Sequence, residues 1–139
     1  IRPWQFVLEP LSGILWLAVK MIEESKFSEA WNFGPASDSK QSTVKMMLKA
    51  ISTEWDINQS IIEENTNNEL HEDKFLNIDS SKAEKLLGLK SVYNLQEAIT
   101  ETVSWYKHFI EQENEIKNFS IEQIKNYTDH AKQLNLSWT

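Results

Sequence analysis

Three histidines are the residues best suited to metal binding or general acid–base catalysis in this chain: His71, His108 and His130. They lie far apart in the sequence. Only His71, which Glu72 follows, begins the H-E-x-x-H pattern that places two metal ligands on one face of a helix. The second histidine of that pattern is missing, and the chain has no cysteine. We therefore expect no metal site and no thiolate chemistry.

Motifs for covalent catalysis and for dinucleotide binding are equally weak. The stretches Ser42–Lys45 and Ser104–Lys107 match S-x-x-K, but the companion motifs are missing, so both matches are interpreted as chance. No tyrosine is followed four residues later by a lysine. The three glycines, at positions 13, 34 and 88, are too dispersed for a phosphate-binding loop. We expect no catalytic residue and no NAD-binding motif in these 139 residues.

Two short groups of residues could bind a phosphorylated ligand. Arg2 precedes Pro3 and Trp4 at the start of a predicted strand, where a guanidinium can make two contacts with a phosphate or carboxylate. His71 can donate to a phosphate, and Glu72 can accept from ribose hydroxyls. The alternatives are a surface arginine near the end of the chain and a solvated pair in a polar loop.

The composition of the chain limits the kinds of partner that it can bind. The chain has 14 basic and 21 acidic side chains, a net charge of −7, which argues against a nucleic-acid partner. No apolar run approaches the roughly 20 residues that cross a membrane, and no signal-peptide pattern opens the chain. We predict a single cytoplasmic region. The first residue is Ile1 rather than methionine, which suggests a piece of a longer protein.

Apolar spacing predicts short strands that alternate with helices, a helix-rich α/β or α+β fold. Strands are expected at 4–7, 30–33, 57–63 and 75–78, and helices at 8–24, 43–54, 83–87, 94–110 and 120–134. Asn94 with Glu97, and Ser120 with Gln123, resemble capping boxes that begin helices, and Gly88 should end one. Gly13 lies inside the first helix at a cost of up to ~1 kcal/mol, which predicts either close packing there or another demand on the backbone.

Residues 2–13 read R-P-W-Q-F-V-L-E-P-L-S-G and resemble the R-P-W-Q-H-V-L-E-P-L-S-G-Y segment of CDP-glucose 4,6-dehydratases. These enzymes belong to the extended short-chain dehydrogenase/reductase superfamily. Residues 29–35 (E-A-W-N-F-G-P) are similar to another family block. So are the L-H-E at 70–72 with the L-x-x-D-x-S-K-A of 76–83, and the ending at 87–106. The resemblance spans nearly the whole chain.

The resemblance implies an α/β fold in which this chain is the C-terminal, substrate-binding part and lacks the N-terminal Rossmann domain. Residues 1–111 would be the part shared with the superfamily, and residues 112–139 a C-terminal helical extension. The parent would be an NAD-dependent lyase that makes CDP-4-keto-6-deoxyglucose for the deoxysugars of surface polysaccharides such as lipopolysaccharide. Its NAD would bind the missing part, so the fragment alone would bind no NAD and be inactive. The parent would be a homodimer, and the isolated fragment would be marginally stable or self-associate.

In such enzymes the arginine of the R-x-W strand contacts the diphosphate, and Arg2 matches it. His71 and Glu72 match a P-H-E loop near the nucleotide. Three positions depart from the family: Phe6 replaces a histidine, Leu70 a proline, and Asn68 a frequent arginine. Two alternatives stay open: part of another nucleotide-sugar epimerase or dehydratase, and a non-enzymatic helical interaction domain.

Overall fold

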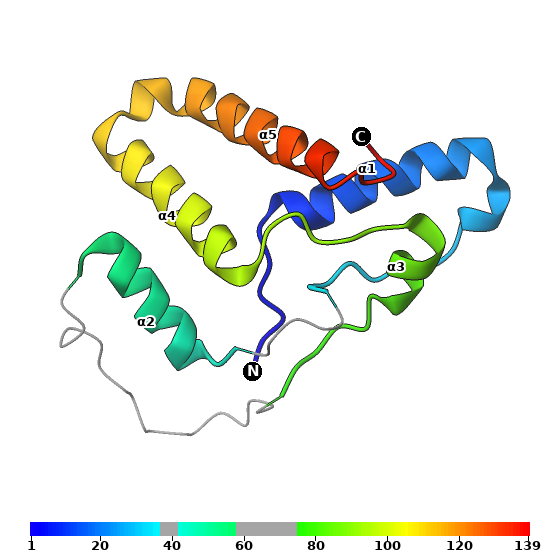
Figure 1. Cartoon of the computed structure of the whole chain (residues 1–139), viewed down its shortest axis with the longest axis horizontal. Helices are drawn as coiled ribbons and strands as arrows, with labels where there is room; N and C mark the ends of the chain where they lie inside the picture. Colours follow the sequence, from blue (N-terminus) through cyan, green and yellow to red (C-terminus); the bar gives the residue numbers. More distant parts are fainter. Residues whose placement is uncertain (37–41, 58–74) are drawn as a thin grey trace.

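The computed structural model describes residues 1–36, 42–57 and 75–139. Within these residues the chain forms helices linked by extended segments (Figure 1). The α-helices are α1 (Leu8–Glu23), α2 (Val44–Trp55), α3 (Ser81–Leu87), α4 (Leu95–Glu111) and α5 (Ile116–Gln133). Two short 3₁₀ turns, Ser25–Phe27 and Glu113–Glu115, follow α1 and precede α5.

Helices α4 and α5 form an antiparallel pair, and α2 packs beside α4 (Figure 1). The capping box predicted at Asn94 is confirmed, because the Asn94 side chain accepts from the backbone of Glu97 and the Glu97 carboxylate accepts from the backbone of Asn94. Gly88 ends α3 in the left-handed conformation (φ 66°), as expected. The start predicted at Ser120 is wrong: α5 begins four residues earlier, at Ile116.

The predicted strands at 4–7, 30–33 and 75–78 are also wrong for this chain. In the described residues these segments form no β-ladder, and the β-pairing is an isolated antiparallel bridge between Arg2 and Ser42. A β-strand forms backbone hydrogen bonds with a neighbouring strand. In these segments, side chains make some of the hydrogen bonds that a neighbouring strand would otherwise make. The backbone carbonyl of Phe33, for example, accepts from the side-chain amide of Gln5 (3.2 Å) instead of from the backbone of a neighbouring strand. The expectation of a helix-rich fold is confirmed. The strand predicted at 57–63 lies outside the described residues, except for Ile57.

The buried apolar side chains of the described residues form three small clusters rather than one core. The first joins the start of the chain to α5 and contains Phe6, Val92, Ala98, Tyr127, Ala131 and Leu136. The second joins α1 to α3, where the Trp16 indole N–H donates to the carbonyl of Leu87 (2.9 Å). The third lies between α2 and α4. Small clusters stabilise a fold less than one continuous core, because they bury less apolar surface.

One face of α1 carries large apolar side chains that stay exposed. This α1 apolar face consists of Leu11, Ile14, Leu15, Val19 and Ile22. Leu15 is 69% exposed and Ile22 is 87% exposed. An apolar stripe on a helix normally packs against another element, and this one is unpartnered in the part of the chain that the structure describes. Even so, none of the helices in those residues has the length and apolar character that crossing a membrane requires.

Candidate functional site

Arg2 lines a cavity of about 740 Å³, hereafter the Arg2 cavity. The guanidinium is held close to the backbone, because its Nη1 donates to the carbonyl of Ile1 (2.8 Å). The connection before α4 and the first turn of that helix also line the cavity, including Tyr93, Asn94 and Gln96. The cavity therefore combines a cation with amide side chains and the amino-terminal end of a helix, whose partial positive charge favours anions.

Trp4, two residues after Arg2 along the extended start of the chain, also lines the Arg2 cavity. Its ring packs against the cluster formed by α2 and α4. Its indole N–H is buried and has no hydrogen-bond partner among the described atoms. The ring is placed to report occupation of the cavity through its fluorescence.

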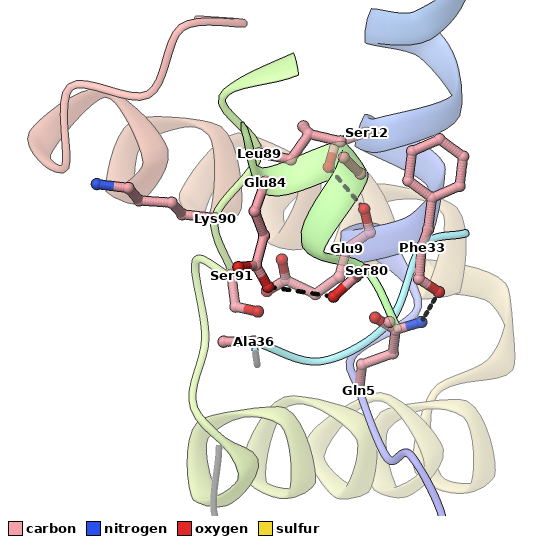
Figure 2. Close-up of a pocket in the computed structure, with 12 residues that line it drawn as sticks. Gln5, Glu9, Ser12, Phe33, Ala36, Ser80, Glu84, Leu89, Lys90 and Ser91 are labelled. Atoms are coloured by element: carbon pink, nitrogen blue, oxygen red, sulfur yellow. Dashed lines mark hydrogen bonds between the residues drawn. The ribbon is translucent and has the colours of Figure 1, made fainter. Parts of the chain in front are cut away.

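A second cavity, of about 480 Å³, adjoins the first, because Gln5, Ala36 and Ser91 line both. Figure 2 shows the close-up of this second cavity, which α1, α3 and the segment 33–36 enclose. Its polar groups are already engaged with one another: the Ser80 hydroxyl, for instance, donates to the carboxylate of Glu84 (3.1 Å). The Lys90 side chain points away from the cavity (Figure 2). The second cavity therefore offers less charge for an anionic ligand than the first.

Glu9, in the first turn of α1, is a carboxylate that lines the second cavity and accepts several hydrogen bonds. It accepts from the backbone N–H of Val92 (3.0 and 3.1 Å, one to each oxygen), from that of Tyr93 (2.9 Å) and from the hydroxyl of Tyr127 (3.0 Å). Burial raises the pKa of the Glu9 carboxyl above its usual 4.5, although these hydrogen bonds act in the opposite direction. Burial and the neighbouring Glu9 also raise the pKa of the Tyr127 phenol.

The structure places only one of the three predicted site residues. Arg2 lies at a cavity, as described above. His71 and Glu72 lie outside the described residues, so their role near a nucleotide stays a prediction. The departures from the family at Asn68 and Leu70 lie outside them as well.

The third departure, Phe6, is a core residue rather than a site residue. Its side chain is 5% exposed, and its ring lies 5.5 Å from that of Tyr93 and 6.1 Å from that of Tyr127. A phenyl ring suits this apolar position because it needs no hydrogen-bond partner. Phe6 is not among the residues that line the Arg2 cavity, but it packs in one cluster with Val92 and Ala98, which do.

The other two histidines each lie against an aromatic ring instead of meeting at a site. His108 stacks on Phe119 with the ring centroids 4.2 Å apart, and His130 lies 5.5 Å from Tyr93. In residues 1–36, 42–57 and 75–139, no three side chains of the metal-binding types come together.

Reasoning from the sequence missed Glu9 and the residues that it holds. The one local signal was a carboxylate between apolar neighbours, Leu8 and Pro10, inside the R-P-W-Q block. Its partner Tyr127 is 118 residues away, and no periodicity or motif connects the two.

Comparison with known proteins agrees with the blocks seen in the sequence. No family model matches the chain. A stretch of 115 residues is 40% identical to CDP-glucose 4,6-dehydratase of Salmonella typhimurium (strain LT2) and covers 82% of this chain and 32% of that relative. The chain thus spans about a third of the length of the curated relative that it matches. The resemblance drawn from residues 2–13 and the later blocks is confirmed: the chain matches the C-terminal part of CDP-glucose 4,6-dehydratase.

Proposed function

We propose that this chain is the nucleotide-sugar-binding part of an NAD-dependent CDP-glucose 4,6-dehydratase and that Arg2 binds the diphosphate of the substrate. The observation that carries the proposal is that Arg2, from the block most specific to this enzyme, lines a cavity large enough for part of a ligand. The 40% identity to the Salmonella enzyme supports the same substrate class.

The lining of the Arg2 cavity suits an anionic ligand, although it offers that ligand few positive charges. A guanidinium forms charge-assisted, paired hydrogen bonds with phosphate oxygens. The amino-terminal end of α4 adds partial positive charge to the same cavity, and the nearby Glu97 carboxylate offsets part of it. We therefore expect binding that is specific but weak in this chain alone, with further cations supplied by the rest of the parent protein.

The remainder of the proposal concerns that parent. NAD and the catalytic residues would belong to its N-terminal Rossmann domain, and residues 112–139 would be a helical extension of the substrate-binding part. The reaction is a lyase reaction: C4 of the sugar is oxidised, which acidifies the proton at C5. Water then leaves across C5 and C6, and the hydride returns to C6. We place the enzyme in the cytoplasm, in the synthesis of deoxysugars for surface polysaccharides.

We further propose that the parent is a homodimer and that the 139-residue chain, taken alone, associates with itself through the α1 apolar face. The exposed fractions of Leu15 and Ile22 support this proposal, because covering such side chains removes apolar surface from water.

The test is a titration of the 139-residue chain with CDP-glucose, followed by tryptophan fluorescence. TDP-glucose serves as the competing nucleotide sugar. We compare Arg2→Ala with Lys117→Ala, which removes the same charge from an exposed position on α5. Loss of a paired, charge-assisted contact should raise Kd about 10- to 100-fold for Arg2→Ala and leave Lys117→Ala close to wild type.

Two results would contradict the proposal. Equal affinity of wild type and Arg2→Ala would remove Arg2 from the site. Equal affinity for CDP-glucose and TDP-glucose would favour another epimerase or dehydratase of nucleotide sugars.

A further inference from the structure

The connection between α3 and α4 lacks regular secondary structure, yet its backbone is held at two successive positions by one side chain. The N–H groups of Val92 and Tyr93 both donate to the carboxylate of Glu9, which comes from α1. Val92 is buried, so its N–H group has little access to water as an alternative partner. Removing the carboxylate would leave two neighbouring backbone donors unsatisfied, at a cost in local stability for each.

The same connection forms part of the wall of the Arg2 cavity. Residues 91–99 line that cavity without a gap, from the connection into the second turn of α4. Val92 and Tyr93 come directly before the N-cap residue of α4, so the position of these two residues bears on where the first turn of α4 lies relative to Arg2. Glu9 itself lines only the second cavity, so it acts on the Arg2 cavity through the residues it holds.

Helix α5 fixes the carboxylate in turn. The Tyr127 hydroxyl donates to Glu9 and lies 3.2 Å from the hydroxyl of Ser12, one turn further along α1. The Tyr127 ring also meets the ring of Tyr93 edge-on, with the centroids 5.3 Å apart. One residue of α5 thus contacts both Glu9 and a residue that Glu9 holds, which restricts the rotamers of both.

We propose that Glu9, braced by Tyr127, is a positioning residue that sets the wall of the Arg2 cavity and so links the C-terminal helix to nucleotide-sugar binding. The link to binding rests on the function proposed above. The hold on the cavity wall does not, because it rests on contacts within the chain. The two can therefore fail separately.

The experiment measures amide hydrogen exchange of the 139-residue chain, residue by residue, for wild type, Glu9→Gln and Tyr127→Phe. The matched control is Glu122→Gln, the same chemical change at an exposed position on α5. The Val103 amide, inside α4, reports the stability of the helix itself. The CDP-glucose titration is repeated for each variant.

In Glu9→Gln the amide NH₂ takes the place of one of the two acceptor oxygens, which removes the second Val92 contact and the acceptor of the Tyr127 hydroxyl. The remaining oxygen holds Val92 and Tyr93 only as a neutral carbonyl, which is a weaker acceptor than a carboxylate. We expect exchange at these two amides to accelerate about tenfold or more, which corresponds to the loss of ~1.4 kcal/mol of local protection. Exchange at Val103 should stay within twofold of wild type. Tyr127→Phe should show the same pattern at smaller amplitude, and Glu122→Gln should show none. CDP-glucose affinity should fall in the order of the exchange effects.

Unchanged exchange at Val92 and Tyr93 in Glu9→Gln would overturn the proposal. So would an equal acceleration at all three amides, which would show a contribution to overall stability alone. If Glu9→Gln does not fold, Tyr127→Phe decides by the same criterion. Accelerated exchange with unchanged CDP-glucose affinity would refute the link to binding. If the wild type binds no CDP-glucose, the proposed function fails, and exchange still decides whether Glu9 sets the wall.

Discussion

Phe33 lies so close to Gly13 that a Cβ atom at position 13 would come within 2.7 Å of the Phe33 ring and within 3.2 Å of Leu89. The close packing expected from a glycine inside a helix is therefore confirmed. It joins α1 to the extended segment that was predicted as a strand.

Gly13→Ala should destabilise the chain, because overpacking costs about 1–3 kcal/mol whereas helix propensity returns at most about 1 kcal/mol. The measurement is the free energy of unfolding from chemical denaturation. Ala18→Gly, at an exposed position of the same helix, isolates the propensity effect. A Gly13→Ala chain more stable than wild type would show that Phe33 moves aside without cost.

The raised pKa of Glu9 gives the stability of the chain a defined pH dependence. The residues with titratable side chains that act on the Glu9 carboxyl are Tyr93, Glu97 and Tyr127. Between pH 4.5, the usual pKa, and the higher pKa in the fold, the folded chain holds more protons at this group than the unfolded chain. The contribution of Glu9 to the free energy of unfolding must therefore decrease as the pH rises through this window.

Denaturation of wild type and Glu9→Gln from pH 4 to pH 8 checks this sign. As the pH rises, the free energy of unfolding of the wild type should decrease relative to that of Glu9→Gln. A constant difference would show that the hydrogen bonds cancel the effect of burial on the pKa, and a shift in favour of the wild type would show that they outweigh it and lower the pKa.

The capping box of α4 is a third target. Asn94→Ala removes the acceptor of the Glu97 backbone N–H (3.1 Å) and should cost about 0.5–2 kcal/mol of stability. Asn126→Ala, in the interior of α5 and exposed, should change stability by less than about 0.5 kcal/mol. Equal effects in the two variants would mean that the cap contributes nothing beyond helix propensity.

The proposed self-association is tested on the α1 apolar face. Leu15→Glu with Ile22→Glu should raise the dissociation constant of the assembly at least about tenfold, since charged side chains resist burial. Sedimentation velocity over a range of concentrations measures it. The control is Ile121→Glu with Ile124→Glu, which adds the same charge on α5 at side chains that are 55% and 51% exposed. Equal weakening by both pairs would point to charge repulsion rather than to this face.

The helices were predictable because their hydrogen bonds are local. The region 94–110 and the helix observed at Leu95–Glu111 agree to within a residue, and Asn94, Glu97 and Gly88 are local signals of where a helix begins or ends. The helix start predicted at Ser120 was wrong because the Ser120 hydroxyl donates within α5 to the Ile116 carbonyl instead of capping the beginning of a helix.

The strands were not predictable in the same way, since residues 4–7, 30–33 and 75–78 have strand-like composition but strands exist only as pairs. Of the candidate site, the block at Arg2 was visible in the sequence. The hold of Glu9 on Val92 and Tyr93, and its bond to Tyr127, depend on tertiary contacts that no local pattern encodes.

The α1 apolar face has one more consequence, for the temperature dependence of stability. Side chains such as Leu15 and Ile22 are hydrated in the folded monomer and stay hydrated when it unfolds. These side chains therefore add almost nothing to the apolar area that unfolding of the monomer exposes, and the heat-capacity increase is smaller than it would be with the face covered. The stability curve of the monomer should therefore be less strongly curved than that of an assembly in which this face is covered, and covering the face should also raise the curve.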